Sequence, residues 1–200
     1  MKITILVEGK TEIAFKPYLR SHLEKRLAGK MPKLDFFPYY GRIPTGDKLK
    51  RVVEKLLNDK QPADAVIALT DVYTGSEPPE FLTAEDAKKK MREWVGVEER
   101  FHPHVALHDF EAWLLPYWEK IKAMTGNNRK APGPYPEKVN HGNPPAHRLG
   151  EVFRTGSKTQ SYVKTRDAGR ILKDEDLSEA INACPELKAF VDTIIKTCED

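Results

Sequence analysis

Three acidic side chains stand where apolar, strand-like runs of the sequence end. Glu8 follows the run at residues 3–7, Asp71 follows that at 63–70, and Glu111 comes shortly after a third run. In an open α/β sheet the carboxyl ends of parallel strands meet at one edge, where ligands and catalytic groups collect. Carboxylate oxygens are the ligands that Mg²⁺ and Mn²⁺ prefer, and such an ion can bind a phosphodiester and activate water. The sequence therefore predicts that Glu8, Asp71 and Glu111 bind a divalent metal ion and act in catalysis.

Neighbouring residues extend this prediction, and each of them also has a simpler interpretation. Glu12 and Asp109 are further acids at the same predicted edge. His108 directly precedes Asp109, where its ring could transfer a proton or orient a carboxylate. Taken singly, each acid could instead cap the following helix or lie in solvent, and His108 could bond to the backbone. The presence of acids at three strand ends is what favours the metal site.

A basic region with interspersed tyrosines occupies much of the chain after residue 128. Clustered Lys and Arg with Tyr can bind a phosphate backbone, although an ordinary solvated surface has the same composition. Tyr162 and Lys164 precede a helix that Asp167 is expected to cap, which makes them the preferred phosphate anchor. Tyr73 lies in the loop after Asp71, where its ring could meet a ligand. The candidates for substrate binding are Lys10, Tyr73, Arg148, Tyr162, Lys164 and Arg166.

Strand-like and helix-like segments alternate over roughly the first 120 residues, which predicts parallel βαβ units. The run at 63–70 is almost uninterrupted in apolar character, as suits a strand in a sheet that is covered on both faces. The predicted strands are 3–7, 34–40, 63–70 and 101–107, and the predicted helices begin near residues 11, 49 and 83, with a further change to helical spacing at 108–115.

The composition changes after residue 125. Residues 126–145 are rich in Gly, Pro and Asn, which predicts a long loop that is either a surface excursion or an active-site lid. Short helical patterns follow at 146–153, 167–172, 178–184 and 186–197. We therefore expect an α/β core at 1–125 and a loop and helical extension at 126–200, packed together as one domain.

Overall composition sets few limits on the partner. With 33 basic and 30 acidic side chains the formal net charge is +3, so whole-protein charge does not indicate a polyanion ligand. Cys184 and Cys198 are expected to be buried free thiols, as in a reducing cytoplasm. The chain begins at once with a strand-like run and contains no window of about 18 apolar residues. These features predict a soluble cytoplasmic protein without a membrane span.

Several short motifs occur together in one order. The segment Val7-Glu8-Gly9-Lys10-Thr11-Glu12 resembles the first motif of Toprim domains, in the form seen in OLD-type nucleases and small Toprim-like proteins. The segments DVYTG at 71–75 and HDFEAWLL at 108–115, with YVK at 162–164, are similar to a prokaryotic Toprim-like family of unknown function. That family includes RloG-like proteins, which are often encoded beside AAA-type ATPases in defence loci. The resemblance covers nearly the whole chain.

The resemblance implies a Toprim-like, Rossmannoid α/β fold, in which a mostly parallel sheet with an acidic, Mg²⁺-binding edge lies between helices and carries a helical C-terminal extension. Glu8 matches the Toprim glutamate and Asp71 matches the first aspartate of its Asp-x-Asp element. Tyr73 stands where Toprim enzymes carry the second aspartate, so that either Glu111 completes the site or metal binding is weakened.

Three functions follow from these patterns. The first is a nuclease, or another phosphodiester-processing protein, that uses Mg²⁺ or Mn²⁺ and acts with an ATPase partner in defence against foreign nucleic acid, with His108 as the candidate for proton transfer. The second is a non-catalytic module on a degenerate Toprim fold that binds nucleic acid, a nucleotide or the partner, which Tyr73 favours. The third is a small-molecule phosphohydrolase.

Overall fold

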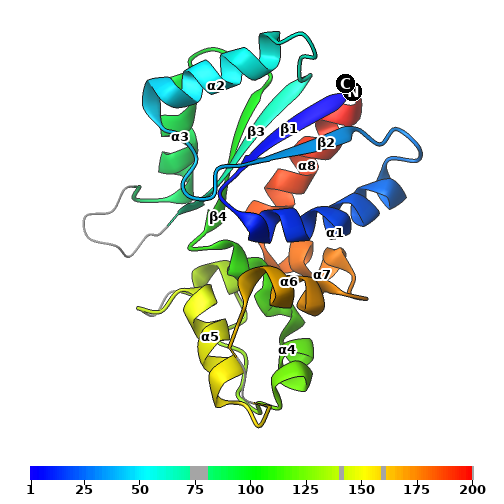
Figure 1. Cartoon of the computed structure of the whole chain (residues 1–200), viewed down its shortest axis with the longest axis vertical. Helices are drawn as coiled ribbons and strands as arrows, with labels where there is room; N and C mark the ends of the chain where they lie inside the picture. Colours follow the sequence, from blue (N-terminus) through cyan, green and yellow to red (C-terminus); the bar gives the residue numbers. More distant parts are fainter. Residues whose placement is uncertain (73–80, 140–141, 159–160, 200) are drawn as a thin grey trace.

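Four apolar runs form the strands of one parallel sheet, whose strand order is β2-β1-β3-β4 (Figure 1). The computed structural model describes residues 1–72, 81–139, 142–158 and 161–199. Ile5 of the first strand pairs with Phe36 on one side and with Ile67 on the other. This arrangement confirms the predicted α/β class with a parallel sheet. The strands are β1 (Lys2–Val7), β2 (Lys33–Pro38), β3 (Ala65–Val72) and β4 (Phe101–Leu107).

Helices cover both faces of the sheet, because successive side chains of a strand point to opposite faces. Ile5 packs in a cluster with side chains of α1 (Lys10–Arg26) and α8 (Pro185–Glu199), which lie on one face (Figure 1). Leu6 packs in a second cluster with α2 (Gly46–Asn58) and α3 (Ala84–Val95) on the other face. Each fully buried Ile, Leu or Phe contributes roughly 1.5–3 kcal/mol of stabilisation. Burial on both faces explains why β1 and β3 are nearly continuous apolar runs.

The segment after β4 forms a set of short helices below the sheet in Figure 1. Trp113 is fully buried at its centre, with ring centroids 5.2 Å from Phe110, 6.0 Å from Phe15 and 6.2 Å from Phe190. Residues on both sides of position 125 therefore belong to one hydrophobic cluster. The elements are η1 (Phe110–Tyr117), α4 (Trp118–Thr125), η2 (Pro136–Lys138), α5 (Pro145–Thr155), α6 (Lys164–Leu172) and α7 (Leu177–Ala183).

Three local features differ from the sequence-based expectations. β3 continues through Asp71 to Val72, because these residues still pair with β4. The segment predicted to turn helical after β4 is a 3-10 helix, which contains Pro116, a residue that cannot donate the hydrogen bond of a regular helix. α6 begins at Lys164, so that Asp167 lies inside the helix and accepts a hydrogen bond from the backbone N of Val163 at 2.8 Å.

Other expectations are confirmed. Thr83 caps α3 by accepting a hydrogen bond from the backbone N of Asp86 at 3.1 Å. Cys184 and Cys198 are free, buried thiols. None of the helices within the described ranges combines the length and the apolar character needed to cross a membrane.

Candidate active site

Five carboxylates come together at the carboxyl edge of the sheet. Glu8 follows β1, Glu12 lies in the first turn of α1, Asp71 is near the end of β3, and Asp109 and Glu111 lie at the junction of β4 and η1. Burial raises the pKa of Asp71 well above its ordinary value, and the charges of the other four acids raise it further. Because β1, β3 and β4 are parallel, acids from three segments of the chain lie close enough for their charges to interact.

Glu8 is held in a defined orientation by β3. Its Oε1 atom accepts hydrogen bonds from the Thr70 hydroxyl and, at 3.2 Å, from the backbone N of Asp71. Burial raises the pKa of Glu8, and these two hydrogen bonds offset part of that rise. Glu12 accepts a hydrogen bond from the backbone N of Gly9 at 3.1 Å, and burial together with Glu8 and Glu111 raises its pKa. The first two acids are thus fixed by contacts with their own loop and with the neighbouring strand.

Asp109 and Glu111 are fully buried. The Oδ2 atom of Asp109 accepts a hydrogen bond from the backbone N of Ala146, in the first turn of α5, at 3.1 Å. Its Oδ1 atom is buried and has no hydrogen-bond partner among the described residues. Burial and the charge of Glu111 raise the pKa of Asp109 to about 7. A buried carboxylate oxygen without a hydrogen-bond donor lowers the stability of the fold. The position of Asp109 is therefore not explained by a role in stability alone.

Lys164 and Tyr162 reach the acids from the segment that precedes and opens α6. The Nζ atom of Lys164 lies 3.2 Å from Oε2 of Glu111, and the Tyr162 hydroxyl donates to Oε1 of the same carboxylate at 3.4 Å. Burial alone would lower the pKa of Lys164, but Glu111 and Asp109 raise it above its ordinary value. Burial and Glu111 also raise the pKa of Tyr162. Lys164 therefore neutralises part of the negative charge.

His108 links β4 to η1 through a left-handed backbone with φ of 72°. Its backbone N donates to the carbonyl of Val72 at 2.8 Å, and its ring is buried. Burial lowers the pKa of His108, because the charged form of the ring is disfavoured away from water. The Nδ1 atom has no partner in the described part of the chain. His108 precedes Asp109 in the chain, but its Nδ1 atom forms no hydrogen bond with any of the five acids.

Two other predicted substrate-binding residues lie on α1 and α5, the helices that contribute Glu12 and the donor to Asp109. Lys10 is the first residue of α1 and is exposed, with Nζ 5.8 Å from the centroid of the Tyr40 ring. Arg148 lies on α5 and forms a 4.0 Å ion pair with Glu151. The Nε atom of Arg148 is buried without a partner among the described residues. Lys10 thus shares α1 with Glu12, and Arg148 shares α5 with Ala146, whose backbone N donates to Asp109.

Arg166 has no contact with the five acids among the described residues. Arg166 forms a 2.8 Å ion pair with Asp167, which also pairs with Arg170 at 3.1 Å. These contacts assign Arg166 a role at the start of α6. Tyr73 lies outside the described residues, as does most of the 71–75 motif.

Sequence reasoning missed the hydrogen-bond partners of the acids. Thr70 was visible only as a polar residue at the end of an apolar run, and its hydroxyl bonds to Glu8 across the sheet. Lys164 and Tyr162 were assigned to phosphate, whereas the structure shows them in contact with Glu111. No local pattern identifies partners that are more than 50 residues apart.

The five carboxylates offer the kind of ligand that a hard divalent cation prefers. Their positions in this structure do not form a ready coordination site. Their ligand atoms are all oxygens, and one buried oxygen of Asp109 has no partner among the residues that the structure describes. Within the described ranges, no group of three His, Cys, Asp or Glu side chains is set to hold a metal ion. The pairing of Glu111 with Lys164 and of Glu8 with Thr70 accounts for part of this difference.

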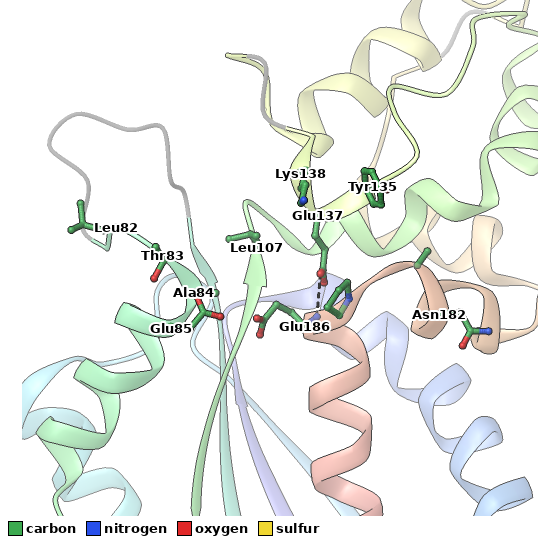
Figure 2. A pocket seen from close by; sticks show the side chains of 12 residues that line it. Leu82, Thr83, Ala84, Glu85, Leu107, Tyr135, Glu137, Lys138, Asn182 and Glu186 are labelled. Carbon is green, nitrogen blue, oxygen red and sulfur yellow. Dashed lines mark hydrogen bonds between the residues drawn. The ribbon is translucent and has the colours of Figure 1, made fainter.

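A separate cavity of about 500 Å³ opens between α3, the end of β4 and the start of α8 (Figure 2). None of the five acids lines it. Glu137 in its wall accepts hydrogen bonds from the indole N of Trp113 at 3.0 Å and from the backbone N of Glu186 at 3.1 Å. Glu137 therefore caps α8 and supports the core, and the cavity is not the candidate active site.

Comparison with known proteins identifies one family and one fold. The family model described as "Domain of unknown function (DUF4276)" matches residues 7–195. No curated protein matches the sequence significantly. The C-terminal region of the Burkholderia pseudomallei OLD protein is similar in structure, with a TM-score of 0.54 and 15% identity over 98% of this chain and 96% of that one. The C-terminal region of the Xanthomonas campestris pv. campestris OLD protein has a TM-score of 0.49 and 15% identity over 98% and 93%. At this identity the first likeness shows a shared fold.

Proposed function

The chain belongs to the DUF4276 family, and we propose that it is a metal-dependent nuclease or another phosphodiester-processing protein. The observation that carries this proposal is the gathering of five carboxylates at the carboxyl edge of a parallel sheet, one of which has a buried oxygen without a hydrogen-bond partner in the described part of the chain. The resemblance of its motifs to OLD-type nucleases agrees with the fold shared with the B. pseudomallei OLD region.

Glu8, Asp71 and Glu111 would hold the ion, Mg²⁺ or Mn²⁺, with Asp109 beside them. When bound, the ion would supply charge neutralisation for a phosphodiester and activation of water. The chain itself contributes the orientation: β3 fixes Glu8 through Thr70, and α5 fixes Asp109 through Ala146. His108, just after β4, is the candidate for proton transfer.

Positive side chains around the acids would position the substrate. Lys164 is half-exposed and already lies at the acids, so its ammonium group can also meet a phosphate. Lys10, Arg148 and Tyr162 stand on neighbouring elements, and Tyr73 and Arg166 complete the proposed binding set. The resemblance of its motifs to RloG-like proteins, which are often encoded beside AAA-type ATPases, is what suggests a partner for this chain. We propose an AAA-type ATPase as that partner, in defence against foreign nucleic acid.

A cleavage assay with purified protein tests the reaction. We expect Mg²⁺ or Mn²⁺ to support nicking of DNA or RNA by the wild type, and Glu8→Gln and Asp71→Asn to abolish it. Asp35→Asn, which changes a half-buried acid on β2 outside the acidic cluster, serves as the matched control and should retain activity. Unchanged cleavage in the Glu8→Gln and Asp71→Asn variants would remove the basis for this assignment.

A non-catalytic binding module is the second candidate. It is favoured by the lack of a ready-made set of three metal ligands in the described part of the chain, and by the pairing of Glu111 with Lys164. Calorimetric titration separates the two functions. Binding of nucleic acid or of the partner without uptake of a divalent cation supports the module, whereas uptake that Asp71→Asn prevents supports the enzyme.

A further inference from the structure

An exposed aromatic side chain stands beside the acidic site. Tyr40 follows β2 and is 69% exposed, and the backbone N of the next residue, Gly41, donates to the carbonyl of Glu8 at 2.9 Å. We propose that Tyr40 and Lys10 form a platform on which a base of single-stranded nucleic acid stacks next to the acidic site. This inference rests on the proposed function, and it names the class of substrate.

The backbone of Tyr40 is held in an unfavourable conformation. Its φ of 52° lies in the left-handed region, which aromatic residues rarely adopt and which Gly or Asn occupies at lower cost. Hydrogen bonds of both neighbours hold the backbone there. The backbone N of Tyr39 donates to the carbonyl of Val7 at 3.0 Å, and that of Gly41 donates to the carbonyl of Glu8. Burial of the ring does not offset the conformational free energy of this backbone, because most of the side chain lies in solvent. Strain retained at an exposed side chain is characteristic of functional positions.

One cation lies over the ring, and a second follows on the same loop. The Nζ atom of Lys10 lies 5.8 Å from the ring centroid, within the range of a cation–π contact. Arg42 is two residues further along the same loop, and its charge lowers the pKa of Glu8 against the rise caused by burial. A nucleotide presents a flat base joined to an anionic phosphate. An aromatic face with a lysine ammonium group over it, beside an acidic centre, matches both parts of it.

The neighbouring aromatic residues do not share these properties. Phe37 and Tyr39 pack against each other, with ring centroids 5.4 Å apart. Tyr135 is 63% exposed and also has a lysine over its ring, Lys138 at 5.0 Å, but it lines the cavity that contains none of the five acids. Tyr135 therefore provides a control of the same chemistry in another place.

The proposed ligand is a single strand because a ring can stack only on a base whose face is free. In a duplex the faces of the bases are covered by their neighbours, whereas unpaired bases stack readily on aromatic side chains. A stacking platform is tolerant of sequence, since every base has a π face.

Fluorescence of 2-aminopurine within a single-stranded oligonucleotide tests the platform, with chelator present so that binding is measured without cleavage. We expect the wild type to quench the fluorescence on binding. Tyr40→Ala should bind about tenfold more weakly and lose most of the quenching, whereas Tyr40→Trp should keep both. Tyr135→Ala should behave as the wild type. A duplex of the same sequence should bind with an affinity that Tyr40→Ala does not change.

Equal binding by wild type and Tyr40→Ala would overturn the platform, as would equal losses in Tyr40→Ala and Tyr135→Ala or no binding of the single strand. The proposed function fails in a different way. If no cleavage occurs but Tyr40 is required for quenching, the reaction is wrong and the platform stands. If cleavage requires Glu8 while Tyr40→Ala binds as the wild type, the platform is wrong and the reaction stands.

Discussion

Replacing Asp109 by Asn is expected to stabilise the metal-free protein at alkaline pH. Asp109 is fully buried, and burial together with Glu111 raises its pKa from 3.8 to about 7. The folded state therefore binds this proton more tightly than the unfolded state does. Stability falls as the pH rises between the two pKa values, from about 4 to about 7, and the full penalty of the buried carboxylate is present above that window.

The size of this penalty follows from the two pKa values. A change from 3.8 to about 7 corresponds to about 4 kcal/mol, at about 1.36 kcal/mol for each tenfold change in proton affinity. The side-chain oxygen of Asn can still accept the hydrogen bond from the backbone N of Ala146. Its NH₂ group takes the place of Oδ1, which has no partner among the described residues, and can donate toward the carboxylate of Glu111. Relaxation of the neighbouring acids reduces the effect, so we expect a net gain of about 2 kcal/mol in the free energy of unfolding.

Urea unfolding in the presence of chelator measures this gain at about pH 8 and at about pH 4. Asp109→Asn should exceed the wild type in stability at the higher pH and match it at the lower pH, where Asp109 is protonated in the folded protein. Asp35→Asn, which lies on β2 outside the acidic cluster, should show no such pH dependence. A loss of stability in Asp109→Asn at pH 8, or an equal gain at both values, would refute the electrostatic reasoning.

The other predictions concern the partners of the site and of the core. Lys164→Met should lower the free energy of unfolding by about 1–2 kcal/mol in urea unfolding, because Glu111 remains buried without its cation. Lys188→Met, which breaks an exposed ion pair, is the control and should change it by less than about 0.5 kcal/mol. Glu137→Ala should cost about 2–4 kcal/mol, measured by urea unfolding, because it leaves a buried indole and helix N–H groups unpaired; a cost below 1 kcal/mol would contradict this. Tyr40→Asn should raise the free energy of unfolding by about 1 kcal/mol, since Asn tolerates the left-handed backbone, and a stability loss would show that the ring itself supports the fold.

The sequence predicts the sheet and its acidic edge because both depend on local patterns. Apolar runs of strand length mark β1 and β3, and βαβ alternation makes the strands parallel. Once the strands are parallel, Glu8 and Asp71 must lie at the same edge, and the 3.2 Å hydrogen bond from the backbone N of Asp71 to Oε1 of Glu8 shows that they are close. Glu111 joins them because η1 begins at Phe110, shortly after β4 ends at Leu107.

The contacts of these acids could not be predicted, because they depend on how distant segments pack. Lys164 is brought to Glu111 by the packing of α6 against η1, across 53 residues of sequence. Asp167 resembles a helix cap in the sequence, but it lies inside α6, where Arg166 and Arg170 pair with it. The left-handed backbone at Tyr40 also has no sequence signal, since that conformation usually selects Gly or Asn.

The central claim is that the acids at the carboxyl edge of the sheet bind a divalent cation. Anomalous diffraction from crystals soaked in Mn²⁺ tests it most directly. We expect a Mn²⁺ peak within about 2.0–2.6 Å of carboxylate oxygens from Glu8 and Asp71, and its loss in Asp71→Asn. A Mn²⁺ peak elsewhere on the protein, with none between these carboxylates, would contradict the claim.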